Sequence, residues 1–227
     1  MDHHSTRSGP ILAFDTSGPW LSAALVEKGV VRLARHEEMA RGQAERLFVL
    51  LEEMLREAGR AWGELAALGV GIGPGNFTGI RIAVAAARGL SLALGIPAHG
   101  VSRFEALAES APRPALLALD ARRERLWLAR LGADGPEEPV LVPLAEIERH
   151  PVLEGLPATA PVIGERAGEI AARIDRPARA PALTLGTAIA RIAARRDPAG
   201  ATPPAPLYLR PADAAPPSEP PVPILDA

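Results

Sequence analysis

Two polar loops that follow short apolar stretches are the places in this chain where chemistry is most easily imagined. Asp15, Thr16 and Ser17 follow the apolar residues 11–14. A carboxylate beside two hydroxyls suits a hard cation such as Mg²⁺ with a bound phosphate. The same three side chains also hydrogen-bond their own backbone in turns, and the residues alone favour that interpretation.

The second loop is glycine-rich, with the sequence GPGNFTG at residues 73–79. It lies between an expected strand and an expected helix, where free amides and the helix dipole favour an anion, so Gly73, Gly75 and Thr78 are candidate phosphate-binding residues. The lysine of a P-loop is missing, because Lys28 is the sole lysine and lies far off in the sequence. A tight turn with close packing is the interpretation that the residues favour.

The sequence does not contain the residue patterns that several other classes of enzyme need. The chain has no cysteine, which excludes disulfides, thiolate zinc sites and cysteine nucleophiles. His36-Glu37-Glu38 does not complete the zinc-protease motif because Ala40 stands where its second histidine belongs. No serine lies in a GxSxG motif, and the net charge of −2 gives no overall basic field for nucleic acid. We therefore expect neither a metal site nor a catalytic residue.

The elements that must position these loops alternate between strand and helix. Apolar stretches at 11–14, 21–26 and 30–34 predict a three-stranded antiparallel meander, because Gly29 allows the second reversal. Apolar residues at helical spacing predict helices at 44–58 and 80–94, each followed by a glycine. Strands are expected at 68–72 and from Pro97 onward. This pattern predicts an α/β fold.

The second half of the sequence is harder to interpret. A hairpin is expected from residues 115–119 and 126–130, and a helix from 184–196. The proline content of residues 198–227 favours an extended or disordered tail. No internal repeat is visible in the sequence.

The helix at 80–94 is apolar almost all round, so it must be buried on more than one side. It is too short for a membrane span and carries two arginines. The pattern leaves open whether the rest of this chain or another subunit covers it. The candidate interface on this helix and on the helix at 44–58 comprises Leu47, Leu51, Met54, Leu55, Ile80, Ala83, Val84, Ala87, Arg88 and Ser91.

Several motifs follow one another in the order of a known family. They are ILAFDTS at 11–17, RGQAERL at 41–47, GPGNFTGIR at 73–81, LDAR at 119–122 and PLYLRP at 206–211. With these motifs the chain resembles the TsaB (YeaZ) family, densely over residues 10–125 and later mainly at 206–211. The resemblance implies an actin-like, ribonuclease-H-like α/β fold with two subdomains, the second of them reduced.

The implied organisation has four parts. They are a disordered N-terminus at 1–9, an N-terminal α/β subdomain with partner-binding helices at 10–109, a smaller C-terminal α/β subdomain at 110–212 and a proline-rich tail at 213–227. In this interpretation Asp15, Thr16, Ser17, Gly73, Gly75 and Thr78 are a vestigial phosphate or nucleotide loop.

The resemblance also implies a role without catalysis. Subunits of this family bind the catalytic TsaD through helices of the N-terminal subdomain. With the ATPase TsaE, they are required for threonylcarbamoyl transfer to adenosine 37 of tRNAs that read codons starting with A. We therefore expect a cytoplasmic protein with no cofactor and no membrane contact, which meets tRNA only through the complex. A homodimer through the same helices is a further expectation.

The sequence departs from its relatives in one region. TsaD-type proteins bind metal through a histidine pair on the first helix, whereas Gln43 and Ala44 occupy that region here. The alternative function is a stand-alone enzyme of the actin-like superfamily, either metalloprotease-like or a small-molecule kinase. The absent metal and nucleophile motifs weigh against the first, and the short second half weighs against the second.

Overall fold

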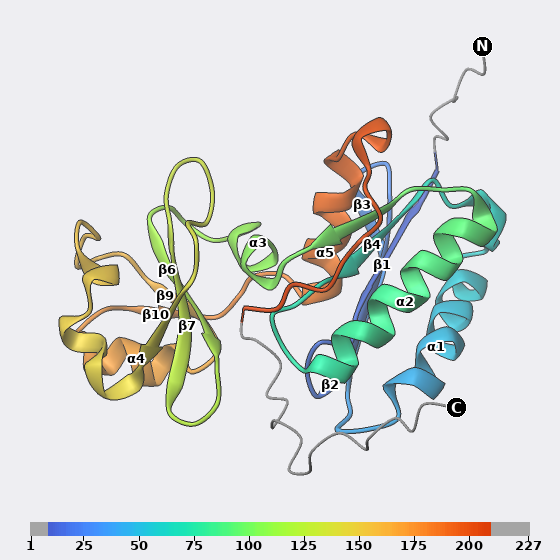
Figure 1. Ribbon diagram of the computed structural model, residues 1–227. Coiled ribbons are helices and arrows are strands. Elements are labelled where there is room, and N and C mark those ends of the chain that lie inside the picture. Colours follow the sequence, from blue (N-terminus) through green and yellow to red (C-terminus); the bar gives the residue numbers. More distant parts are fainter. Residues whose placement is uncertain (1–8, 210–227) are drawn as a thin grey trace, which may run out of the picture.

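A computed structural model describes residues 9–209 as two lobes, each built on a five-stranded mixed sheet (Figure 1). The first lobe contains β1 (Ile11–Asp15), β2 (Trp20–Glu27), β3 (Val30–Glu38), α1 (Gln43–Glu57), β4 (Ala67–Gly71), α2 (Phe77–Leu94), β5 (Ala98–Val101) and α5 (Leu185–Arg195). The second contains β6 (Ala115–Asp120), β7 (Arg125–Leu131), β8 (Val140–Pro143), β9 (Val162–Gly164), α4 (Ala167–Arg173) and β10 (Ala178–Arg179). Helix α3 (Arg103–Ala108) lies between the lobes, and four short 3₁₀ turns occur at Trp62–Glu64, Leu144–Arg149, Pro151–Leu153 and Pro198–Gly200.

The two sheets share one topology. The first has the order β3-β2-β1-β4-β5, with antiparallel pairing from β3 to β1 and parallel pairing from β1 to β5. The second, taken from its antiparallel edge, has the order β8-β7-β6-β9-β10 and the same pairing. The sequence showed no internal repeat, so the repeat is one of architecture.

The elements expected in the first hundred residues are confirmed, as are the hairpin of β6 and β7 and the helix α5. Their boundaries have local causes. Asn76 begins α2 by accepting a hydrogen bond from the Gly79 amide at 3.0 Å, and Gly95 ends it with a φ of 63°. Ser102 and Glu105 form a capping box on α3, a helix that the sequence analysis did not find.

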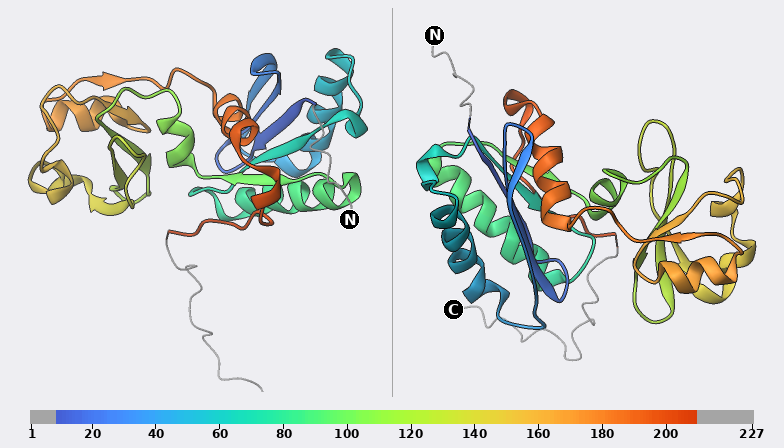
Figure 2. Two further views of the ribbon diagram at one scale, coloured as in Figure 1. Left: turned by 90° about the horizontal axis from the view of Figure 1, so that it is seen from above. Right: turned by 180° about the vertical axis from the view of Figure 1, so that it is seen from behind.

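Helices cover both faces of the first sheet. Alternate residues of β1 face opposite sides: Phe14 packs beneath α1 and α2, whereas Ala13 packs against α5. Figure 2 shows α1 and α2 on one side of this sheet and α5 on the other. Helix α5 approaches closely because Gly186 has no side chain; a Cβ there would lie 2.7 Å from the Ala23 carbonyl carbon.

The chain returns to the first lobe after the second sheet is complete. Helix α5 packs against β1, β2 and β4, although the sequence analysis placed residues 110–212 together in one subdomain. The segment after α5 runs extended along the first lobe, where the Leu207 amide donates to the Ile72 carbonyl at 2.8 Å. The extended course expected for the proline-rich stretch is thus seen as far as residue 209. The expectations for residues 1–8 and 210–227 fall outside the described residues.

Candidate functional site

The loop after β1 and the loop before α2 lie against each other at one edge of the first sheet. The Asn76 amide donates to the Ser17 carbonyl at 2.6 Å, and the Thr16 hydroxyl donates to the Gly79 carbonyl at 2.6 Å. Gly75 is needed for this approach, because a Cβ there would lie 2.3 Å from the Ser17 carbonyl oxygen. The two predicted loops therefore meet, as expected for the ends of neighbouring parallel strands.

The Asp15 carboxylate is enclosed at this junction. Its Oδ1 accepts hydrogen bonds from the Ser17 amide, the Ser17 hydroxyl and the Trp20 indole N–H, each at 2.9 Å. Its Oδ2 has no hydrogen-bond partner among the described residues and points at Gly71, where a Cβ would lie 1.8 Å from it. The Asp15 side chain thus anchors the β1 loop and is shielded from solvent.

The residues of this junction do not fit a magnesium-bound nucleotide. Mg²⁺ prefers six oxygen ligands, several of them water, whereas Asp15, Thr16 and Ser17 are shielded from solvent, so water has no access to complete the coordination. Among residues 9–209, no group of three histidine, aspartate or glutamate side chains is placed to hold a metal. Thr78 alone of the predicted phosphate-loop side chains is exposed.

Arg103 joins the two lobes beside this junction, and the sequence analysis missed it. Its guanidinium pairs with Glu165 of the second lobe at 2.6 Å, lies 5.1 Å from the ring centre of Trp20 and donates to the Pro74 carbonyl at 3.3 Å. Glu165 also accepts the Asp120 amide at 2.7 Å. Protein side chains thus bridge the two lobes beside the loop junction.

The structure corrects the predicted interface. Eight of its ten residues lie in the protein's own interior, because the larger apolar stripes of α1 and α2 pack on the first sheet; these eight are Leu47, Leu51, Met54, Leu55, Ile80, Ala83, Val84 and Ala87. Arg88 is exposed and Ser91 is half-buried. A docking surface on these helices must therefore use their other sides.

The solvent side of α2 carries a seam of mostly small residues, Thr78, Ile82, Ala85, Gly89 and Leu92. Their spacing of four, three, four and three residues keeps them on one stripe of a helix. Leu92 is 87% exposed, and a Cβ at Gly89 would contact nothing within 4 Å. This seam is apolar, open and flat enough for another backbone to approach.

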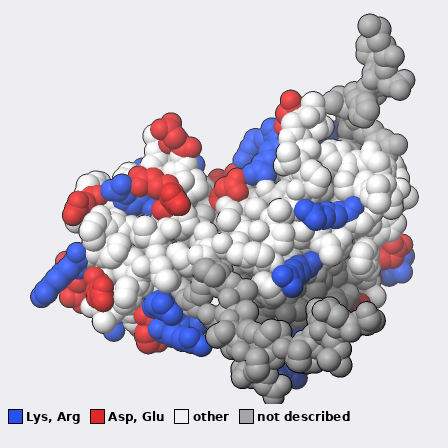
Figure 3. Space-filling model, viewed as in Figure 1, with Lys and Arg blue, Asp and Glu red and all other residues white. Residues whose placement is uncertain are grey.

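Helix α1 extends the seam into a wider apolar face. Phe48 and Val49 are exposed, and with Trp62, Leu90 and Leu94 they line a groove of about 720 Å³. Three charged residues of α1, namely Glu52, Glu53 and Arg56, also line it. In Figure 3 the surface over α2 is mostly white, with separate blue groups. We call this surface, formed by the α2 seam and the groove, the α1–α2 face.

Helix α2 is also the one helix of the described residues that is long and apolar enough to cross a membrane. Core helices of globular proteins are often as long and as apolar. Five residues of α2, from Gly79 to Ala87, are buried against the first sheet. The helix is therefore built into a lobe on one side and open on the other.

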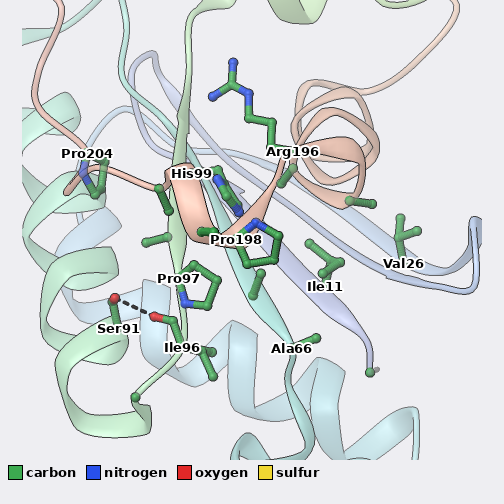
Figure 4. Close-up of a pocket in the computed structure, with 18 of the residues that line it drawn as sticks. Ile11, Val26, Ala66, Ser91, Ile96, Pro97, His99, Arg196, Pro198 and Pro204 are labelled. Carbon is green, nitrogen blue, oxygen red and sulfur yellow. Dashed lines mark hydrogen bonds between the residues drawn. The ribbon is translucent and has the colours of Figure 1, made fainter. Parts of the chain in front are cut away.

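A second concave region lies at the opposite end of the first sheet, with a volume of about 1560 Å³ (Figure 4). Ile11, Ile96 and Pro198 line it, together with His99 and Arg196. The His99 ring is buried, and its Nε2 has no hydrogen-bond partner among residues 9–209. Burial lowers the pKa of His99, and the nearby Arg196 lowers this pKa further, while Asp197 opposes both.

His99 is expected to make the fold sensitive to mild acid. Its pKa is lowered in the folded state, so below about pH 6.5, the ordinary pKa of histidine, the unfolded chain binds a proton that the folded chain does not. The free energy of unfolding should therefore fall as the pH drops from about 6.5 through the folded-state pKa, and be unaffected by His99 above that window. Urea unfolding across this range should show a steeper fall for the natural chain than for His99→Asn. An NMR-titrated pKa at or above 6.5 would contradict the expectation.

Comparison with known proteins adds sequence relatives. The family model for TsaD, the tRNA N6-adenosine threonylcarbamoyltransferase, matches residues 35–138. An uncharacterized protein of Mycobacterium tuberculosis is 35% identical over 185 residues, which cover 74% of this chain and 87% of the relative. The tRNA threonylcarbamoyladenosine biosynthesis protein TsaB of Escherichia coli is 35% identical over 157 residues, covering 64% of this chain and 68% of that protein.

The solved structures that resemble this chain include members of the same family. A Pseudomonas aeruginosa protein described as similar to peptidase YeaZ superposes with a TM-score of 0.71 and 29% identity, over 89% of this chain and all of that one. YeaZ from the same organism gives a TM-score of 0.64 at 30% identity, covering 81% and 90%. The ethanolamine utilization protein EutJ of Carboxydothermus hydrogenoformans gives 0.54 at 12% identity, covering 80% and 89%, which shows a shared fold alone.

Proposed function

Because the chain belongs to the TsaB (YeaZ) family, with the actin-like α/β fold, we propose that it is a non-catalytic subunit in the formation of threonylcarbamoyladenosine on tRNA. Its partner in this proposal is a TsaD-type catalytic subunit, with a TsaE-type ATPase as the third component. The chain acts in the cytoplasm by binding and supporting that partner, and the transfer targets adenosine 37 of tRNAs that read codons starting with A.

The observation that carries this proposal is the uncovered α1–α2 face. An apolar surface of this kind usually marks a site of protein interaction. The small residues of the α2 seam, Ala85 and Gly89, let another helix come close, and the protruding Leu92 supplies a side chain for a hole in that helix. The fitting occupant is a pair of helices that adds to α1 and α2.

The groove beside the seam has the anatomy of a specific interface. Phe48 and Trp62 supply aromatic surface to it, and aromatic residues are enriched among those that contribute most to binding at interfaces. Glu52, Glu53 and Arg56 add charges, which typically set orientation and partner choice. A second copy of this chain would bring the same residues to the face in a two-fold arrangement, and such a homodimer is the competing occupant of the face.

The loops at the lobe junction support a role without catalysis. The Asp15 carboxylate holds its own loop, the Thr16 hydroxyl joins that loop to the start of α2, and the Arg103–Glu165 pair bridges the lobes. These groups therefore hold the first lobe in the shape that presents α1 and α2. In this proposal the two loops predicted as a vestigial phosphate site therefore have a structural role.

Binding at the α1–α2 face is testable with two matched substitutions. Leu92→Asp and Val30→Asp each place a charge at an exposed aliphatic position, 87% and 60% exposed, but Val30 lies on β3, outside the face. We expect Leu92→Asp to weaken binding of the TsaD-type subunit by about tenfold or more, since it buries an unpaired charge. Val30→Asp should bind like the natural chain. Sedimentation with the purified partner measures both.

A transfer assay completes the test. With TsaD-type and TsaE-type proteins, threonylcarbamoyl adenylate and tRNA, omission of this chain should abolish product, and Leu92→Asp should restore less product than Val30→Asp. Undiminished modification without the chain would refute the proposed role. A homodimer of the chain alone that the partner does not displace would assign the α1–α2 face to self-association.

A further inference from the structure

A cluster of two aromatic rings and one arginine stands on the surface where the C-terminal segment meets α2. Phe77 and Tyr208 stack with their ring centres 5.1 Å apart, and they stay 42% and 43% exposed. The Arg81 guanidinium lies 3.7 Å from the centre of the Phe77 ring, and its Nε donates to the Tyr208 hydroxyl at 2.9 Å. We call these three residues the aromatic–arginine cluster.

The cluster joins the C-terminal segment to α2, but it is not the only contact that holds this segment. That segment is held by its backbone and its apolar residues: the Leu207 amide donates to Ile72, the Pro204 carbonyl accepts from Arg88 Nε at 2.8 Å, and Pro204 is buried. Tyr208 stacks on Phe77 and still leaves 43% of its surface exposed. Its hydroxyl fixes Arg81 in place, which reduces the entropy that this arginine would lose on binding a ligand.

The two segments that carry the cluster, α2 and residues 201–209, have charges of one sign only. Helix α2 has two arginines, Arg81 and Arg88, and no acidic residue in its eighteen positions, and residues 201–209 carry no charge. Neither arginine makes an ion pair within the part of the chain that the structure describes: Arg81 donates to the Tyr208 hydroxyl and Arg88 to the Pro204 carbonyl. Two cations without acidic partners beside open aromatic rings complement a polyanion with flat bases.

We propose that the aromatic–arginine cluster binds single-stranded RNA, with a base stacked on the exposed aromatic surface and phosphates near Arg81 and Arg88. Single-stranded RNA is recognised by stacking on aromatic rings and arginine planes, together with contacts to its phosphates. A paired RNA helix hides its bases and is a poor ligand for such a cluster. The choice of tRNA as the RNA rests on the proposed function.

The aromatic–arginine cluster lies next to the surface that the proposed partner covers. Phe77, Arg81 and Arg88 share one side of α2, next to the seam that the proposed partner covers. RNA on the cluster would therefore lie at the edge of the interface between the two proteins. An overall charge of −2 fits this arrangement, because the contact is local and needs a second surface for strong binding.

Photo-crosslinking with a 4-thiouridine-substituted tRNA transcript tests the proposal, on the chain alone and with the TsaD-type subunit. Mass spectrometry should place crosslinks at Tyr208 or Phe77, and a fully paired RNA duplex should compete poorly. In anisotropy measurements on the complex, Tyr208→Ala and Arg81→Gln should each weaken RNA binding by about fivefold or more. Tyr208→Phe keeps the ring and should retain crosslinking.

Arg173→Gln is the matched control, since it removes an exposed arginine from α4 in the second lobe. It should bind RNA like the natural chain. Equal losses in Arg173→Gln and Arg81→Gln, or no crosslink at the cluster in either state, would overturn the proposal. The proposal would also fail if Tyr208→Ala and Arg81→Gln lost binding to the TsaD-type subunit but kept their RNA crosslinks. That outcome would assign the cluster to the protein interface. Failure of the chain to bind its partner refutes the proposed function alone, because crosslinking to the free chain still decides the RNA contact.

Discussion

Replacing Gly89 by glutamine is expected to stabilise the isolated chain and to weaken its binding to the partner. Gly89 lies inside α2, where a Cβ would contact nothing within 4 Å, so the substitution gains helix propensity of about 0.5 kcal/mol without a clash. In the complex the same side chain would separate two closely packed helices. Overpacking of this kind costs roughly 1 to 3 kcal/mol, or about five- to 150-fold in affinity.

Gly168→Gln is the control for this prediction. Gly168 also lies in a helix, α4, with open space around its would-be Cβ, but it belongs to the second lobe. Thermal unfolding should show a gain for Gly89→Gln and a smaller change for Gly168→Gln, which lies in the first turn of α4, whereas isothermal titration with the TsaD-type subunit should show a loss for Gly89→Gln alone. Unchanged partner affinity for Gly89→Gln would show that the α2 seam does not face the partner.

Gly79 lies ten residues before Gly89 in the same helix, and we expect Gly79→Ala to destabilise the fold. A Cβ at Gly79 would lie 1.9 Å from the Thr16 carbonyl oxygen, a backbone atom that cannot move without displacing the β1 loop. The loss of the loop junction should reduce the free energy of unfolding by about 3 kcal/mol or more. Gly89→Ala should instead raise it by about 0.5 to 1 kcal/mol.

Urea unfolding of the two alanine variants measures this contrast, which intrinsic propensity alone does not predict. Helix propensity favours alanine at both sites. If Gly79→Ala were as stable as the natural chain, the contact between the β1 loop and the start of α2 would not be the rigid junction described above. The same result would remove the structural purpose assigned to Asp15.

The fold of the first lobe was predictable because its elements are long and periodic. Strand β2 has eight residues and α2 has eighteen, enough for alternation or helical spacing to be recognised. In the second lobe β8, β9 and β10 have four, three and two residues, too few for a period to show. The common strand order of the two sheets was therefore invisible in the sequence.

The meeting of the two loops was predictable, but the exposed side of each helix was not. A helical wheel shows that α2 is apolar on two sides, and it does not say which side meets the helix's own sheet. The sequence analysis predicts an interface on the bulky stripe with Ile80 and Val84, but this stripe packs on the first sheet, because bulky apolar side chains are what a sheet face buries. The small residues Ala85 and Gly89 on the opposite side were the available signal.

The bridge from Arg103 to Glu165 and the left-handed residues Arg122, Arg123 and Glu124 had no signal in the sequence. Arg103 and Glu165 are 62 positions apart, and no local pattern pairs them. The three left-handed residues form the turn between β6 and β7 without any glycine, the residue that usually marks such a conformation. Tertiary contacts, including the bond from the Asp120 amide to Glu165, hold that turn.

Because α5 comes late in the chain, one face of the first sheet is covered only late in synthesis. The strands of the first sheet are complete once residue 101 has been translated, yet the helix that covers the sheet's Ala13 and Ala24 side ends at residue 195. At 5 to 20 residues per second, the ribosome needs roughly 5 to 20 seconds for the residues between. During that interval the apolar face of the first sheet that α5 will cover stays exposed to solvent. Newly made chains should therefore recruit chaperones until α5 emerges and docks.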